Sequence, residues 1–250
     1  MIKETLLPNI EKKGMLDMLN SGKRLDGRKF DEFRPVRIET GVYERAEGSA
    51  SAWIGKTFVA AGIKIGEGEP YPDSPNVGVL STNAELCPMA SPTFQAGPPG
   101  EEVIEIARVV DRGIRESKAI ELEKLCIEPG VKTRMVYIDA YMLDYHGNAI
   151  DAASLASVAA LYNTEIPDFG KLPIVKKPIA NTFIKIGENI LLDPSLEEER
   201  AMDARLTVTI EDTDRVCAMQ KAGSGFWMQD EIMQCVETAI KMSKDLRKLI

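Results

Sequence analysis

Acidic side chains gather between residues 191 and 203, where the sequence reads LLDPSLEEERAMD. The apolar residues before Asp193 predict the end of a strand and residues 206–210 predict another, so the carboxylates fall in a connecting loop. Carboxylates at a strand end can bind Mg²⁺ and assist phosphoryl transfer. A solvated acidic turn has the same composition, and the segment by itself favours that simpler interpretation. Whether these carboxylates form a Mg²⁺ site or a solvated turn decides whether the protein is an enzyme.

A row of arginines in the segment 101–119 is the second feature that could have a chemical function. Its members are Arg108, Arg112 and Arg115. On a helix these positions fall within an arc of roughly 60°, opposite an apolar face that includes Val110 and Ile114. Guanidinium groups about 5–6 Å apart approximate the spacing of successive phosphates along single-stranded RNA. The row therefore indicates a possible RNA contact.

The same arginines also have acidic neighbours at helical spacing. The expected pairs are Glu105–Arg108, Asp111–Arg115 and Arg112–Glu116. Such pairs produce an ordinary solvated helix face and contribute only tenths of a kcal/mol each. Spacing alone favours this alternative over RNA binding.

Composition limits the possible functions. The chain has 250 residues, a net charge of −8 and 44% hydrophobic residues, which permits one large or two modest soluble domains. An acidic protein is repelled by nucleic acid on average, so any RNA contact needs a local basic patch. No apolar run reaches the roughly 18 residues of a membrane span, and no signal peptide is recognisable, so we expect a cytoplasmic protein without membrane contact.

Histidine and cysteine usage argues against several mechanisms. The four cysteines, Cys87, Cys126, Cys217 and Cys235, show no paired short spacing, which disfavours a zinc site and a disulfide framework. Any Ser-His or Cys-His mechanism depends on His146, the only histidine, which we interpret as structural. We expect no cofactor and no bound metal. The aromatic residues Trp53 and Tyr71 are interpreted as packing residues.

Hydrophobic periodicity and turn residues predict the order of elements. We expect helices over 3–20, 101–119, 149–161 and 230–250, and strands over 35–39, 49–54, 58–65, 77–81, 134–139, 141–144, 206–210 and 216–220. Adjacent runs of strands between helices predict an α+β fold with mixed sheets flanked by helices. The composition change after Pro167 predicts a division into residues 1–28 (N-terminal helix and arm), 29–166 and 180–250.

Several motifs in sequence order resemble the RNase PH-like family. They are Lys23–Arg28 (KRLDGR), the segment from Asn83 to Pro92 (NAELCPMASP), the helix 106–117, the segment 143–153 (LDYHGNAIDAA) and the segment 192–199 (LDPSLEEE). More narrowly, they resemble the non-catalytic RNase PH-type subunits of the archaeal exosome. The resemblance covers roughly residues 20–250. It implies a fold of the ribosomal protein S5 domain 2 type, in two parts.

Active members of this family degrade RNA from its 3′ end by phosphorolysis, and the chain departs from them at two places. They hold the attacking phosphate with a Ser or Thr followed by Arg after an Asp-Gly-Gly turn. This chain has Asp144-Tyr145-His146 in the turn and Gly147-Asn148 in place of the pair. Losing the arginine removes the bidentate charge that binds a phosphate dianion.

The second departure concerns a pair of aspartates six residues apart in active members. The matching positions here are Glu197 and Asp203. The extra methylene of glutamate displaces the carboxylate by about 1 Å, a shift to which catalytic geometry is sensitive. The resemblance therefore implies a chain without catalytic residues, and the acidic segment is interpreted as a relic of an active site.

The resemblance also implies partners. Inactive subunits of this type alternate with catalytic RNase PH-type subunits in a hexameric ring, which binds RNA-binding cap proteins and threads single-stranded RNA. In that setting Arg108, Arg112 and Arg115 become expected RNA contacts that support the active site of the catalytic neighbour. The alternative is that the chain is itself a phosphate-dependent 3′-to-5′ exoribonuclease. A purely architectural role, with a solvated arginine row, also stays open.

Overall fold

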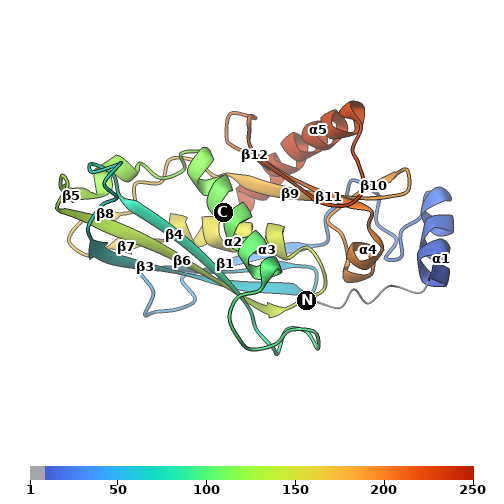
Figure 1. Cartoon of the computed structure of the whole chain (residues 1–250), viewed down its shortest axis with the longest axis horizontal. Coiled ribbons are helices and arrows are strands. Elements are labelled where there is room, and N and C mark those ends of the chain that lie inside the picture. The colour runs from blue at the N-terminus through green and yellow to red at the C-terminus, as the bar shows by residue number, and fades with distance from the viewer. Residues whose placement is uncertain (1–8) are drawn as a thin grey trace.

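The computed structural model describes residues 9–250, with side chains from residue 12 onward (Figure 1). Among these residues, two main sheets and the helices between and beside them form an α+β architecture, as expected. The helix expected over 3–20 corresponds to α1 (Asn9–Asn20), and its residues 3–8 lie outside the described part. No described helix is both long and apolar enough to cross a membrane.

The larger sheet has the strand order β1-β2-β3-β6-β4, with β5 paired to β6. These strands are β1 (Val36–Thr40), β2 (Gly48–Ile54), β3 (Thr57–Gly68), β4 (Val79–Leu86), β5 (Cys126–Glu128) and β6 (Lys132–Asp144). All pairings are antiparallel except that of β4 with β6, which makes the sheet mixed. A short 3₁₀ helix, η1 (Leu122–Leu125), precedes β5.

One prediction about this sheet was wrong. The segment expected to hold two strands, 134–139 and 141–144, is the single 13-residue strand β6. Its inward residues alternate without interruption through Val136, Ile138, Ala140 and Met142, which are all buried. Because Ala140 keeps this period of two, the strand continues where the sequence suggested a break.

The smaller sheet has the order β10-β9-β11-β12, and all its pairings are antiparallel. Its strands are β9 (Ile179–Ile186), β10 (Asn189–Leu192), β11 (Ala204–Ile210) and β12 (Val216–Gly223). A hairpin of β7 (Glu165–Ile166) and β8 (Gly170–Lys171) lies before it in the sequence.

Helices α2 (Glu101–Glu116) and α3 (Ala149–Tyr162) pack between the two sheets, and α5 (Gln229–Leu246) packs on the outer face of the smaller one (Figure 1). A 3₁₀ turn, η2 (Arg247–Leu249), follows α5. Helix α3 is buried on all sides, since it contacts β2 and β3 on one side and β9 on the other. Helix α3 packs against both sheets and so does not belong to one of them alone. The division of the chain into residues 1–28, 29–166 and 180–250 stays a prediction.

The acidic segment is not a loop. Residues Leu196–Ala201 form the short helix α4, which begins with a capping box between Ser195 and Glu198. The Ser195 hydroxyl accepts from the Glu198 N–H, and the Glu198 carboxylate accepts from the Ser195 N–H at 2.8 Å. The Ser-x-x-Glu pattern is the signature of such a helix start, and it gives each carboxylate of the segment a fixed direction.

Candidate functional site

The three arginines of α2 face one shared surface hollow of about 250 Å³. The hollow is lined by Arg108, Arg112 and Arg115 together with Thr82, Ala107, Asp111 and Glu116. The buried face of α2 carries Ile106, Val110 and Ile114 and packs toward the core, so the arginines point outward as the periodicity predicted. The structure thus brings together the residues expected to contact RNA. The contact itself stays a prediction.

Only one of the expected ion pairs on α2 forms. Arg115 donates to Asp111 at 3.0 and 2.9 Å and to the Leu80 carbonyl at 3.1 Å, and this pairing raises the pKa of Arg115. The Thr82 hydroxyl donates to Asp111 at 3.2 Å and fixes it in turn. Arg115 is therefore held in place in the lining of the hollow.

The other two arginines are not neutralised by acids. Arg112 donates to the Gln220 side chain of β12 at 2.9 Å. Arg108 is exposed and has no hydrogen-bond or ion-pair partner among residues 12–250. Glu105, the expected partner of Arg108, pairs instead with Arg205 at 2.7 Å. The hollow therefore carries positive charge available to an anionic ligand.

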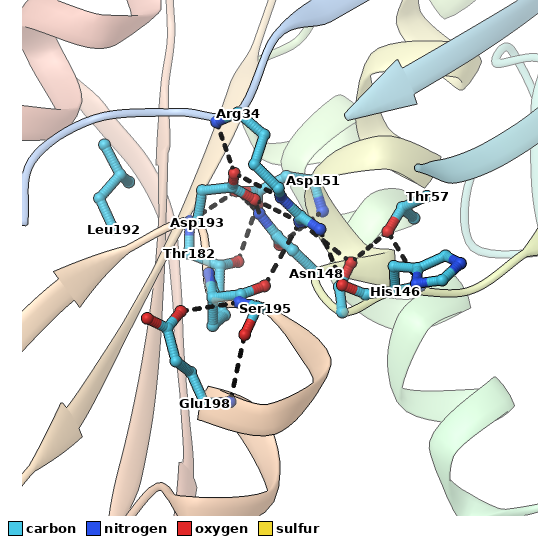
Figure 2. A network of polar contacts seen from close by, with 12 residues as sticks. Arg34, Thr57, His146, Asn148, Asp151, Thr182, Leu192, Asp193, Ser195 and Glu198 are labelled. Carbon is cyan, nitrogen blue, oxygen red and sulfur yellow. Dashed lines mark hydrogen bonds and ion pairs between the residues drawn. The ribbon is translucent and has the colours of Figure 1, made fainter. Parts of the chain in front are cut away.

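The turn that joins β6 to α3 is the second candidate region (Figure 2). Gly147 has φ of +90°, and a Cβ built there lies 2.5 Å from the Ser195 carbonyl carbon and 2.6 Å from the Leu196 nitrogen. These are backbone atoms and cannot move aside cheaply. Any residue with a side chain is therefore excluded at this position unless the turn or the α4 start is rebuilt.

Asn148 turns its side chain away from the surface. It occupies the left-handed region with φ of +58°, which Asn tolerates, and only 1% of it is exposed. Its amide donates to Asp151 at 2.9 Å and to Asp193 at 2.7 Å. Burial alone raises the pKa of Asp193, but hydrogen bonds and charge from Arg34 lower it below its usual value. Asn148 is thus part of a buried polar network.

The two acids matched by the family pattern do not share partners. Glu197 is exposed on α4 and accepts from the Ser195 hydroxyl at 3.0 Å. Asp203 accepts from Lys12 of α1 at 2.8 Å and from the Gly187 N–H at 2.8 Å. The two carboxylates therefore belong to different hydrogen-bond groups. Among the side chains of residues 12–250, no group of three or more His, Cys, Asp or Glu is placed to hold a metal ion.

The acid that faces the turn is Glu199, which the sequence interpretation missed. Its carboxylate accepts from the Asn148 N–H at 2.7 Å and from the Tyr145 hydroxyl. Burial raises the pKa of Glu199, although these hydrogen bonds oppose the effect. On a helix, Glu199 points about 200° away from Glu197. Predicting α4 as a helix would therefore have separated Glu199 from Glu197 as a carboxylate that faces another part of the molecule.

A small cavity lies beside the turn. Its volume is about 10 Å³, the space of about one water molecule, and its polar lining is Glu102, Glu105, Tyr145, Asn148, Thr182, Glu199 and Arg205. Arg205 is already paired with Glu105. Burial and the neighbouring charge of Glu199 raise the pKa of Glu102. The cavity is small and lined by carboxyl groups, so it is unsuited to a phosphate ion.

Three further interpretations can be compared with the structure. His146 has a structural contact through its main chain, because its carbonyl accepts a hydrogen bond from Arg34 at 2.7 Å. Its imidazole lies near the surface, 3.3 Å from Asp144. Trp53 packs as expected, stacked on Phe58 with ring centroids 4.5 Å apart. The packing role expected for Tyr71 was wrong, because this side chain is exposed on a loop.

Comparison with known proteins places these features in context. Residues 32–167 match the family described as the 3′ exoribonuclease family, domain 1, and residues 177–242 match domain 2 of the same family. Exosome complex component Rrp42 of Methanocella arvoryzae is 48% identical over 254 residues, covering 99% of this chain and 98% of that protein. The protein of the same name from Thermococcus gammatolerans is 47% identical, covering 98% and 95%.

Solved structures are similar over the same length. A chain of the structure described as the Archaeoglobus fulgidus exosome with RNA bound to the active site is 46% identical and superposes with a TM-score of 0.92. The match covers 96% of this chain and 97% of that chain. A chain of an archaeal exosome core is 42% identical with a TM-score of 0.88, covering 99% and 98%.

Proposed function

The chain belongs to the 3′ exoribonuclease, or RNase PH, family, and from this membership we propose that it is a non-catalytic ring subunit of an archaeal-type exosome. Its RNase PH-like fold is the one expected from the sequence. In the proposed role it binds single-stranded RNA and completes the active site of a catalytic RNase PH-type partner. That partner alternates with it in a hexameric ring, which carries RNA-binding cap proteins and acts in the cytoplasm.

The absence of catalysis is supported mainly by the turn at Gly147 and Asn148. Active members need a Ser or Thr and an Arg here, and Gly147 has no room for any side chain against the backbone of residues 194–196. Asn148 is buried and committed to Asp151 and Asp193. Without bound phosphate there is no nucleophile for phosphorolysis. This closed turn is the observation that carries the proposal.

Two further observations support the same conclusion. The neighbouring cavity holds about one water and is lined by the carboxyl groups of Glu102 and Glu199, which disfavour an anionic substrate. Glu197 and Asp203 have different partners, and Asp203 is already paired with Lys12. Neither arrangement suits the binding of phosphate and the 3′ end of RNA.

The RNA-binding role rests on the hollow of α2. Among residues 12–250, Arg108 and Arg112 have no acidic partner, and Arg115 is fixed by Asp111 and the Leu80 carbonyl. The hollow therefore presents three guanidinium groups on one helix. Such groups can bind successive phosphates of a strand without any base preference. An acidic protein needs a local path of this kind in order to bind RNA.

The proposal is tested by measuring nucleoside diphosphate release from single-stranded RNA in the presence of Mg²⁺ and phosphate. The purified chain is assayed alone, its catalytic partner alone, and then the assembled ring. We expect no release by the chain alone and a higher rate from the ring than from the partner alone. Release by the chain alone that survives repurification and is abolished by Asp203→Asn would show that it is itself an exoribonuclease.

A further inference from the structure

The carboxylate of Asp193 is surrounded by donors on both of its oxygen atoms. Oδ1 accepts from Arg34 Nη2 at 2.7 Å and from Asn148 Nδ2 at 2.7 Å. Oδ2 accepts from the Arg34 backbone N–H at 2.8 Å, from Arg34 Nε at 2.8 Å and from Arg28 Nη1 at 3.0 Å. Asp193 is 0% exposed, so these five donors replace water entirely (Figure 2 shows Arg34 and Asn148 around it). We call these donors of Arg28, Arg34 and Asn148 the Asp193 cradle.

The donors of the cradle are held by other acceptors as well. Arg34 also donates to the carbonyls of His146 at 2.7 Å and Gly147 at 3.2 Å. Arg28 also donates to the Glu32 carbonyl at 2.7 Å and to Asp26 at 2.6 Å. Because these bonds do not involve the Asp193 carboxylate, we expect both guanidinium groups to keep their positions when that carboxylate is removed.

The backbone of Asp193 makes such a removal possible without rebuilding the chain. Its φ is +50°, in the left-handed region that glycine adopts more readily than any other residue. Asp193→Gly therefore keeps the local conformation and deletes only the side chain. The Asp193 carbonyl still accepts from Arg28 at 3.0 Å and from Arg24 at 3.1 Å.

We propose that the Asp193 cradle is a complete oxyanion site that the chain fills with its own carboxylate, and that Asp193→Gly opens it to a free small carboxylate such as formate. The wild-type chain supplies this anion itself, so its stability does not depend on any bound anion. The site shares Asn148 with the turn on which the proposed function rests. The two proposals are tested by different measurements, formate-dependent melting and nucleoside diphosphate release, so either can fail without the other.

The geometry of the donors selects a planar carboxylate. Two oxygen atoms receive all five donors, and the guanidinium of Arg34 binds both of them in the fork arrangement typical of carboxylates. A phosphate ion brings two further oxygens, for which the cradle offers no donor. Formate carries one negative charge against two guanidinium groups, as the aspartate does, and it fits the space that the deleted side chain leaves.

Thermal unfolding of the full chain provides the test. We compare the wild type and Asp193→Gly in increasing sodium formate, with sodium chloride at the same ionic strength as the reference. The melting temperature of Asp193→Gly is expected to rise by roughly 5 °C at saturating formate, whereas that of the wild type follows the chloride reference. If Asp193→Gly is unfolded in chloride, recovery of a cooperative transition in formate is the expected result.

Two matched variants make the result specific. Asp193→Asn fills the same space without charge, so it is expected to show no response to formate. Combining Asp193→Gly with Arg28→Met removes one guanidinium and should reduce the response at least by half. The proposal is overturned if formate and chloride act alike on Asp193→Gly, if Asp193→Asn responds equally, or if Asp193→Gly stays unfolded in formate.

Discussion

Arg24 and Glu198 form an ion pair from which water is almost completely excluded, although they are 174 residues apart. Arg24 Nε and Nη2 donate to the two carboxylate oxygens at 2.9 and 2.7 Å, and the side chains are 0% and 2% exposed. Arg24 also donates to the carbonyls of Leu192 and Asp193. This pair joins the N-terminal arm to the start of α4 and so fixes the direction of the acidic helix.

Breaking this pair on one side should be strongly destabilising. Arg24→Met leaves Glu198 as a buried carboxylate without a cation, a situation that costs about 3–5 kcal/mol. Urea denaturation of the wild type, Arg24→Met, Glu198→Met and the double variant measures the effect. We expect the double variant to be more stable than the sum of the single losses predicts. Strict additivity would show that the pair does not couple the two segments.

Asp151 should make the stability of the protein depend on pH. Burial raises its pKa from 3.8 to about 7, although hydrogen bonds from Asn148 and Thr182 oppose the shift. The unfolded chain therefore ionises first, and the stabilisation present below pH 3.8 is lost as the pH rises toward 7. The expected slope from this group is at most about 1.4 kcal/mol per pH unit.

Asp151→Asn should remove this contribution to the slope. Asparagine is neutral throughout, and its amide can donate to Thr182 if the Thr182 hydroxyl turns to donate to Thr207, 2.9 Å away. Urea denaturation at several pH values between 4 and 7.5 measures the difference from the wild type. Asp73→Asn, at an exposed turn position, is the control and should keep the wild-type slope. Equal slopes for wild type and Asp151→Asn contradict the prediction.

Removing the arginines of α2 should weaken RNA binding of the assembled ring in a salt-dependent manner. Each alanine substitution at Arg108, Arg112 or Arg115 deletes about one phosphate contact. The plot of log affinity against log salt should therefore become shallower by about 0.7 per substitution. Filter binding or anisotropy with single-stranded RNA at several salt concentrations measures the slope. Lys124→Ala, an exposed cation paired with Glu121 on η1, is the matched control.

The same arginine variants distinguish RNA contact from a structural role. The Arg115–Asp111 pair is partly exposed, so its loss should cost less than about 1 kcal/mol of stability. Melting temperatures close to wild type combined with weaker RNA binding support the proposed contact. Unchanged affinity and unchanged activity of the ring contradict it and leave a solvated helix face.

Gly147→Ala should destabilise the fold through a steric clash. The added Cβ meets the carbonyl carbon of Ser195 at 2.5 Å and the Pro194 oxygen at 2.6 Å, in a backbone region unfavourable for alanine. We expect a loss of at least about 2 kcal/mol in chemical denaturation. Gly100→Ala, where nothing lies within 4 Å of the new Cβ, is the control and should change stability little. If Gly147→Ala is as stable as Gly100→Ala, the turn can rearrange to accommodate a side chain.

Much of the fold could be predicted from local patterns. The helix of the arginine row, the small-residue helix α3 and most strands of both sheets follow from periodicity, because each buries one face or both. The outward arc of Arg108, Arg112 and Arg115 was predicted for the same reason. Two features that were not predicted also have local signals. The unbroken alternation through Ala140 indicates the single strand β6, and the capping box at Ser195 and Glu198 indicates the helix α4.

The contacts around the turn could not be predicted in this way. Arg34 and Asp193 are 159 residues apart, and nothing in either local sequence identifies the other as its partner. The exclusion of a side chain at Gly147 depends on how closely the start of α4 approaches, which only the tertiary structure determines. The family resemblance implied that the phosphate-binding residue types are missing, and at Gly147 the backbone of residues 194–196 leaves no room for a side chain.

The long separation between the two sides of the Asp193 cradle has a consequence for biosynthesis. Arg24, Arg28 and Arg34 leave the ribosome early, but Asp193 and Glu198, the distant carboxylates that bind them, are made 159 to 174 residues later. At roughly 5–20 residues per second, the arm waits on the order of ten seconds or more before it can dock. Docking of the arm must therefore wait until residues 193–198 have been made, and a chain truncated before residue 193 lacks the two carboxylates that bind Arg24, Arg28 and Arg34.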